Sequence, residues 1–183
     1  MRPVPSHLAS SAMLTHFTRG SRHHSPLDNL VAILETGVIR GGRRMVRGRQ
    51  PVVCLFDLPF AELRRVLVRR NRARYQPFGI AIDRRYAFHQ GARPVIYLPW
   101  REARGLLAAA EFWRVVNIEF DRTSPSDWTF EREWRLPGEL RLEPKRCAAL
   151  VESWRDADEV YERFGGHPPC AGVIPLSELF GAA

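Results

Sequence analysis

The chain has 183 residues, of which 45% are hydrophobic and 26% charged, so it can bury the core of one ordinary globular domain. Its net charge of +8 and pI near 10.4 favour polyanionic partners. No apolar run approaches the ~20 residues that cross a bilayer, and the first residues, MRPVPSHLASSAML, lack the apolar segment of a secretory signal. We therefore expect a cytoplasmic protein with no membrane partner.

The hydrophobic pattern predicts the first elements in turn. A short strand is expected at residues 13–18, and Ser25-Pro26 then starts a helix that ends at Gly37. Residues 40–50 are rich in glycine and arginine and predict a loop. The apolar run VVCLFDL at 52–58 predicts a buried strand that Pro59 ends.

The second part of the chain predicts shorter elements. We expect, in order, a basic amphipathic helix at 60–75, a strand at 78–82, a turn at 86–91, a strand at 94–98, a helix at 101–115 that continues into 117–120, a polar loop at 122–127, a strand at 128–136, a strand at 147–151, a helix at 156–164 and a strand at 171–174. Together these elements predict a single α+β domain over residues 13–183 with a mixed sheet, preceded by a flexible N-terminal segment at residues 1–12.

Arginine supplies nearly all of the positive charge, because Lys145 is the one lysine among 28 basic residues. Two clusters stand out: Arg40, Arg43, Arg44, Arg47 and Arg49, and Arg64, Arg65, Arg69, Arg70, Arg72 and Arg74. Guanidinium groups fit phosphate oxygens and indicate a nucleic acid or dinucleotide. The alternative is that these side chains are simply solvated, in a chain encoded by a GC-rich genome.

The candidate metal and nucleophile signals are weak. Cys54, Cys147 and Cys170 are far apart and form no C-x-x-C pair, and His23-His24 has no further ligands at metal spacing, so we expect no metal. The P-loop, G-x-G-x-x-G, H-E-x-x-H and G-x-S-x-G motifs are all missing from the sequence.

His16 is the first candidate site residue, because it lies among threonines in LTHFT, an otherwise apolar strand. A neutral imidazole can donate a hydrogen bond to a ribose hydroxyl or polarise an amide. The alternative is a histidine satisfied within the core.

Glu131 and Glu133 are the second candidate, since alternate residues of a strand point to the same face. Phe130 and Trp134 then point to the core, and the two carboxylates line whatever lies in front of the sheet. Carboxylates there can hold vicinal hydroxyls and stabilise an oxocarbenium ion, as breaking an N-glycosidic bond requires. The alternative is an exposed strand face whose charge the neighbouring arginines balance.

The order of several motifs resembles that of DarT-like ADP-ribosyltransferases. The segments are LTHFT at 14–18, DNLVAILETGVIRGG at 28–42, PVVCLFDLPFAEL at 51–63 and YAFHQGARPVIYL at 86–98. The same order, ended by EREWR at 131–135, also resembles the AbiGi family, which is linked with phage abortive infection. The resemblance spans residues 14–136 and implies a split mixed sheet with flanking helices and NAD, as substrate, in a central cleft.

The resemblance also implies roles for individual residues. The cofactor-binding set would be His16, Phe17, Thr18, Asn29, Leu30, Gly37 and Arg47. Glu133 would be the catalytic carboxylate, Glu131 would orient the acceptor, and Arg49 would assist the acceptor base or contact the pyrophosphate. The family's serine or tyrosine on the second core strand has no counterpart in VVCLFDL, where Cys54 and Asp57 are the only polar residues.

The sequence leaves three functions open. The favoured one is an ADP-ribosyltransferase that modifies a nucleic acid base, or less favourably a protein, as a toxin or phage-defence effector with an antitoxin protein as candidate partner. The second is a catalytically silent basic module that binds nucleic acid or a partner protein. The third is an RNA nuclease or phosphotransferase.

Overall fold

The computed structural model describes residues 12–48, 50–67, 74–120 and 126–180. Its strands are β1 Met13–Phe17, β2 Val38–Arg40, β3 Val52–Phe56, β4 Gly79–Asp83, β5 Arg93–Pro94, β6 Ile96–Tyr97, β7 Val115–Val116, β8 Glu133–Pro137, β9 Glu139–Arg141, β10 Cys147–Val151 and β11 Val173–Pro175. The α-helices are α1 Pro26–Thr36, α2 Phe60–Val66, α3 Arg84–His89, α4 Trp100–Leu106, α5 Trp154–Arg163 and α6 Leu176–Phe180, and the 3₁₀ turns are η4 Ala109–Arg114, η5 Thr129–Glu131 and η6 Pro144–Arg146.

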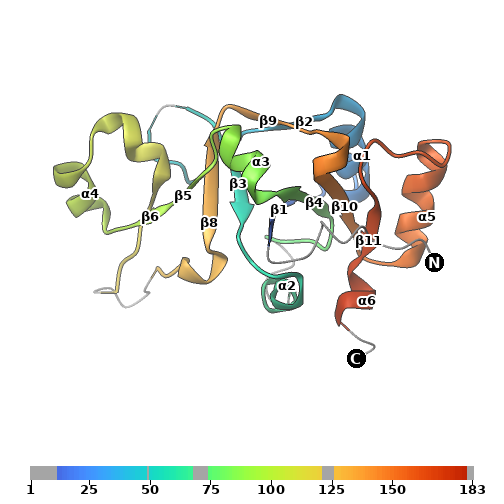
Figure 1. The fold of residues 1–183 in the computed structure, drawn as a ribbon. Helices are drawn as coiled ribbons and strands as arrows, with labels where there is room; N and C mark the ends of the chain where they lie inside the picture. The colour runs from blue at the N-terminus through green and yellow to red at the C-terminus, as the bar shows by residue number, and fades with distance from the viewer. Residues whose placement is uncertain (1–11, 49, 68–73, 121–125, 181–183) are drawn as a thin grey trace.

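Seven described strands form one mixed sheet in the order β11-β10-β4-β1-β3-β8-β5 (Figure 1). Only β10 and β11 run parallel among these pairs. Two small sheets pair β2 with β9 and β6 with β7. The expected α+β class, with helices flanking a large mixed sheet, is confirmed.

The central strands β1 and β3 share the shortest pairing among the longer strands of this sheet. Thr15 and Phe56 are its one residue pair in register, whereas β1 pairs with β4 over five residues and β3 with β8 over five. Beyond Thr15 the two strands therefore separate, and the sheet opens between its two halves.

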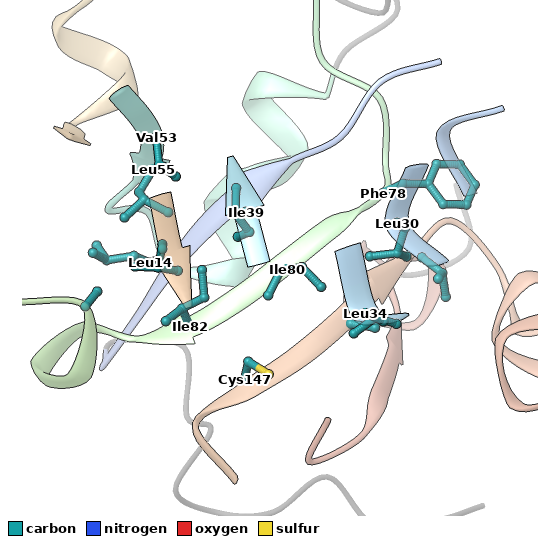
Figure 2. Close-up of a cluster of buried hydrophobic side chains, with 14 of the residues drawn as sticks. Leu14, Leu30, Leu34, Ile39, Val53, Leu55, Phe78, Ile80, Ile82 and Cys147 are labelled. Atoms are coloured by element: carbon teal, nitrogen blue, oxygen red, sulfur yellow. The ribbon is translucent and has the colours of Figure 1, made fainter. Parts of the chain in front are cut away.

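Two hydrophobic clusters cover the two faces of the sheet. On one face Leu14, Ile80 and Ile82 pack against α1, α3 and α5 (Figure 2). On the other face Met13 and Phe56, together with further buried residues, pack against α2 and α6. The alternation of Met13 and Leu14 between the clusters follows from the period of two in a strand.

Helix α1 forms as the sequence predicts. Ser25 and Asp28 make a reciprocal capping box at its start, and Pro26 occupies the first turn. Gly37 ends it with φ of 65°, a left-handed conformation that glycine adopts without steric cost, and its N–H donates to the carbonyl of Ile33.

Several predicted elements are wrong in extent. Residues 86–91 belong largely to helix α3, not to a turn, and the helix expected at 101–120 is replaced by α4, η4 and β7. The backbone turns to extended geometry at Leu107, one residue after α4 ends, and β-branched Val115 and Val116 favour a strand. The strand expected at 94–98 divides into β5 and β6, because Val95 donates to the carbonyl of Glu133 and then leaves the large sheet.

The helix expected at 60–75 is described only as α2, which ends at Val66. Residues 68–73, with Arg69, Arg70 and Arg72, lie outside the described residues, as do Arg49, residues 1–11 of the expected lead-in and most of the loop expected at 122–127. No helix in the described segments is long and apolar enough to cross a membrane.

The first cluster should contribute most of the stability. Leu30→Ala removes a fully buried side chain, and we expect it to lower the free energy of unfolding by about 2–5 kcal/mol through lost burial and the cavity left behind. Urea unfolding measures the change. Leu106→Ala, at a residue 72% exposed, is the matched control and should leave stability nearly unchanged. Equal effects of the two substitutions would contradict the assigned core.

Candidate functional site

The described chain buries three charged side chains, and all three come from one short segment. Glu131, Glu133 and Arg135 are 5%, 6% and 4% exposed. Burying a charge is costly unless it is paired and hydrogen-bonded. These values exclude the alternative of a solvated strand face, so the segment needs a structural or chemical reason for its charges.

Arg135 holds Glu133 with two hydrogen bonds along strand β8. Its Nε donates to Oε1 of Glu133 at 2.9 Å and its Nη2 donates to Oε2 at 3.2 Å. The remaining Nη1 donates to the carbonyls of Trp113 and Val115 at 2.9 and 3.1 Å. Burial alone would lower the pKa of Arg135, but Glu133 more than offsets this and raises it. The two hydrogen bonds therefore fix the Glu133 carboxyl group in one orientation.

Two further groups complete the surroundings of Glu133. The hydroxyl of Tyr97 accepts the backbone N–H of Glu133 at 2.9 Å, and burial raises the pKa of this phenol to about 12. Cys54 lies opposite Arg135 on the neighbouring strand β3. Burial first, and then the Glu133 carboxylate, raise the pKa of the Cys54 thiol, so this cysteine is a neutral hydrogen-bonding neighbour and not a nucleophile.

Glu131 has a separate set of partners. The hydroxyl of Tyr75 donates to its Oε1, and Nη2 of Arg74 lies 3.8 Å from the same atom. Arg74 also donates to Tyr75 at 2.6 Å and stacks on Trp128, 4.0 Å from the ring centroid. Burial is the main cause that raises the pKa of Glu131. The Tyr75 hydrogen bond opposes the shift, and the nearby Glu133 charge adds to it.

The two glutamates do not alternate along one strand, as the sequence suggested. Glu131 ends the 3₁₀ turn η5, and Arg132 adopts φ of 45°, a left-handed conformation unusual for a residue other than glycine. Strand β8 begins only at Glu133. Phe130, which was expected to point to the core, is 47% exposed. The turn thus gives each carboxylate its own environment.

His16 lies where β1 and β3 separate. Its Nδ1 is 2.9 Å from the carbonyl oxygen of Cys54, so this nitrogen must carry the proton and donate. Burial lowers the pKa of His16, and the hydrogen bond to Cys54 only partly opposes this. The imidazole is therefore neutral at pH 7 with a lone pair on Nε2, which accepts a hydrogen bond. The donor role that we predicted toward a ribose hydroxyl is corrected to an acceptor role.

His16 and Glu133 do not face each other across one side of the sheet. The register aligns Thr15, Phe56 and Glu133, which therefore share a face, and strand alternation turns His16 to the face of Leu14. Cys54 links the two sites: its carbonyl meets His16, and its thiol interacts with Glu133. The expected meeting across a groove is thus corrected: the two side chains lie on opposite faces of the sheet and are linked through Cys54.

An aromatic cluster lies on the Glu133 face. The rings of Phe17 and Phe56 are 5.2 Å apart edge to face, and Tyr75 lies 5.2 Å from Phe56 and 6.3 Å from Phe17. Phe17 and Tyr75 thus lie together near the buried glutamates. Tyr75 supplies a tyrosine hydroxyl that strand VVCLFDL itself lacks.

Other predicted binding residues have structural roles in the fold. The hydroxyl of Thr18 donates to the carbonyls of Pro26 and Phe78, and the amide of Asn29 donates to the carbonyl of Arg19. Leu30 is fully buried in the first cluster, and Gly37 is the C-cap of α1. Leu30 presents no surface to a ligand, which corrects its place among the predicted binding residues.

The arginine-rich segments lie on the surface. Arg43, Arg44, Arg64 and Arg65 are exposed and have no ion-pair partner among the residues that the structure describes. Arg47 stacks on Trp100, with its guanidinium carbon 5.1 Å from the ring centroid. The second predicted arginine, Arg49, is outside the described part of the chain.

A pocket of about 280 Å³ lies away from these glutamates, between residues 99–102 and residues 117–120. Within the described residues, no group of three or more histidine, cysteine, aspartate or glutamate side chains is arranged to hold a metal ion. No family model, curated protein or solved structure matches the chain.

The sequence pointed to Glu131, Glu133 and His16 but missed their partners. Arg135 could have been found, since it lies two residues after Glu133 and therefore on the same face of the strand. Tyr75 and Tyr97 carried no such signal, because they approach from segments 56 and 36 residues away.

Loss of Arg135 should destabilise the fold strongly. Arg135→Met leaves the Glu133 carboxylate buried without its partner, and we expect a cost of about 3–5 kcal/mol in urea unfolding. Adding Glu133→Gln should recover part of this loss, because the uncompensated charge is gone. Arg141→Met, at an exposed residue of β9 that pairs with Glu139, is the control and should change little. If Arg135→Met alone were as stable as the wild type, the assigned ion pair between Arg135 and Glu133 would be contradicted.

Glu131 should make stability depend on pH. Its folded pKa lies above the ordinary ~4.3 of the unfolded chain, so the folded state binds more protons between these values. The contribution is fully present below about pH 4 and is lost as the pH rises through the folded pKa. Urea unfolding from pH 4 to 8 should therefore show Glu131→Gln gaining stability relative to the wild type as the pH rises. Glu139→Gln should follow the wild-type curve, and a Glu131→Gln difference that stays constant with pH would refute the shift.

Proposed function

We propose that this protein is an NAD-dependent ADP-ribosyltransferase that modifies a nucleic acid. The observation that carries the proposal is the buried Glu133, oriented by Arg135 and separated from the neutral His16 only by Cys54 at the opening of the sheet. Residues that the resemblance to DarT-like transferases links with NAD therefore lie on either side of Cys54, on the two faces of the sheet. In a cell such an activity would be that of a toxin or phage-defence effector.

The side chains around this opening fit the chemical groups of NAD. The Nε2 lone pair of His16 can accept a hydrogen bond from a ribose hydroxyl. Phe17 is the half-buried member of the cluster that it forms with the buried Phe56 and Tyr75, and its ring suits a planar nicotinamide. A carboxylate has about four acceptor sites, and Arg135 uses two of those on Glu133. The thiol of Cys54 also interacts with this group, so about one acceptor site remains for a ribose hydroxyl.

The reaction needs one bond to break and one to form. The bond between ribose C1 and the nicotinamide nitrogen breaks, nicotinamide leaves as a neutral molecule, and the acceptor atom bonds to C1 and loses its proton. Glu133, oriented by Arg135, would stabilise the positive charge that develops on the ribose. Glu131, with its raised pKa, is the group suited to take the acceptor proton.

The surface charge supports a nucleic acid as acceptor. Arg43 and Arg44 in the loop before β3, and Arg64 and Arg65 on α2, are exposed and lack ion-pair partners within the described chain. Arginines in this state can neutralise phosphates and release counterions. They would bring the strand toward the opening by electrostatic attraction, without reading its sequence.

One observation favours a second function, that of a catalytically silent module that binds nucleic acid or an antitoxin protein. Both oxygens of Glu133 are bonded to Arg135 and the residue is 6% exposed. A carboxylate in this state also serves as a purely structural partner. Such a module would bind nucleic acid through arginine, with no response to NAD.

Labelled NAD incubated with DNA, RNA and a cell lysate tests the first function. We expect label to transfer to one nucleic acid class, and Glu133→Gln to lower the rate by about 10²–10³-fold, because the neutral amide no longer stabilises the ribose cation. Glu139→Gln, at an exposed residue beyond the end of β8, is the matched control and should keep the wild-type rate.

The outcomes separate the two functions. Label on protein alone would show that the acceptor is a protein and not a nucleic acid. A Glu133→Gln transfer rate equal to that of the wild type would show that Glu133 has no role in catalysis. Salt-sensitive nucleic-acid binding without any transfer of label would establish the silent module instead.

A further inference from the structure

The exposed tryptophan at the start of helix α5, Trp154, has a carboxylate fixed beside it. Trp154 is 43% exposed, more than any of the other four tryptophans. Its Nε1 donates to Oε1 of Glu178 on α6 at 2.6 Å, and this hydrogen bond ties the start of α5 to α6. The indole is thus held in place while it stays open to solvent, which lowers the entropy lost when a partner binds.

A second carboxylate lies on the same side of α5. Asp158 follows Trp154 by four residues, so the two side chains are neighbours on the helix surface. Asp158 is exposed and has no ion-pair partner among the residues that the structure describes. The adjacent cation, Arg155, points about 100° round the helix from Trp154. An indole beside two carboxylates attracts a cation through its ring face and through charge.

The same combination of groups holds an arginine elsewhere in this chain. Arg74 lies over the ring of Trp128, 4.0 Å from its centroid, and its Nη2 is 3.8 Å from Oε1 of Glu131. Within the described segments, no arginine lies over Trp154. A guanidinium from outside the chain is therefore the group that fits the Trp154 site, because it can stack on the ring and meet the carboxylates together.

The charge of this end of the chain is opposite to that of the rest. Residues 147–183 contain six acidic and two basic residues, a net charge of −4. Because the whole chain carries +8, residues 1–146 carry +12. An acidic surface on a basic protein is complementary in charge to the remaining surface of another copy.

Helix α2 presents arginines on the same side of the molecule as α6. Both helices cover the second hydrophobic cluster, where Leu63 of α2 and Leu176 of α6 are buried (Figure 1). Arg64 and Arg65 of α2 are exposed and have no ion-pair partner within the described chain. This side therefore carries both the cation and the site that fits it. Such a surface can pair with itself about a two-fold axis, the commonest symmetry of protein dimers.

We propose that this surface is a dimerisation site for two copies of the chain. An arginine of α2, Arg64 or Arg65, stacks on Trp154 of the second copy, where Asp158 and Glu178 balance its charge. The two-fold axis repeats the same contact in the other direction. Exposed stacks and ion pairs are individually weak, so the dimer should form at high protein concentration and dissociate as salt is added. The inference goes beyond the proposed function, because the association uses neither NAD nor nucleic acid.

Sedimentation equilibrium of the full chain alone, at concentrations up to about 1 mM, measures the association. Because each dimer contains the stack twice, Trp154→Ala should weaken association by at least about 5-fold, which corresponds to ~1 kcal/mol. Phe88→Ala is the matched control. This exposed aromatic residue lies on α3, which packs on the other face of the sheet from α2, and its loss should leave association unchanged.

A charge exchange tests which groups meet. The variant Asp158→Arg and the double variant Arg64→Asp with Arg65→Asp should each stay monomeric alone, because like charges then face each other. An equimolar mixture of the two should associate more strongly than either variant alone, since an aspartate then meets an arginine at both contacts. All of these changes are at exposed residues, and circular dichroism verifies that each variant is folded.

Three results would overturn the dimerisation site: a chain that stays monomeric at every concentration, a dimer that Trp154→Ala does not weaken, or charge variants that associate no better when mixed. A monomeric chain that binds an arginine-rich peptide through Trp154 would also overturn it, and would show that the site takes a foreign protein. Because these assays contain no NAD, their failure is distinct from a failure of the proposed transfer reaction.

Discussion

The buried ion pair between Glu133 and Arg135 is the interaction on which the rest of the site depends. Two charges are removed from water there, and the cost is offset only because every group of the arginine has a partner: two carboxylate oxygens and the carbonyls of Trp113 and Val115. The same arginine therefore ties β8 to the segment that ends η4 and starts β7. Replacement by lysine would keep the charge and lose the planar fork that makes these contacts together.

The opening between β1 and β3 is the second constraint. A strand pair that ends after one register position leaves backbone carbonyls without ladder partners, and a buried carbonyl needs a donor. His16 supplies that donor to Cys54, so its tautomer and neutral state follow from a structural need. The consequence for chemistry is an imidazole whose free nitrogen can only accept. The structural role and the proposed role of His16 are thus compatible, since they use different nitrogens.

Some charged side chains of this protein are buried and paired, and others are exposed to solvent. Arg135 and Glu133 are buried and paired with each other, and the buried Glu131 is bonded to Tyr75. By contrast, four exposed arginines have no ion-pair partner within the described residues: Arg43, Arg44, Arg64 and Arg65. Arg47 and Arg74 are also exposed, but each stacks on a tryptophan, Trp100 or Trp128. An arginine-tryptophan stack keeps the cation available at an aromatic surface.

The sequence by itself determined the elements whose signals are local. The capping box and Gly37 define α1, and the apolar runs of β1, β3 and β10 predict strands because each run is long enough to show its pattern. It also singled out His16, Glu131 and Glu133 as chemically unusual. Only the tertiary structure decided that Arg132 breaks the strand between the glutamates, that Tyr75 and Tyr97 reach them, and that His16 leaves the sheet on the other face. The physical reason is that burial, pKa and hydrogen-bond partners are set by segments distant in the chain, whereas helix caps and strand periods are set by neighbours within a few residues.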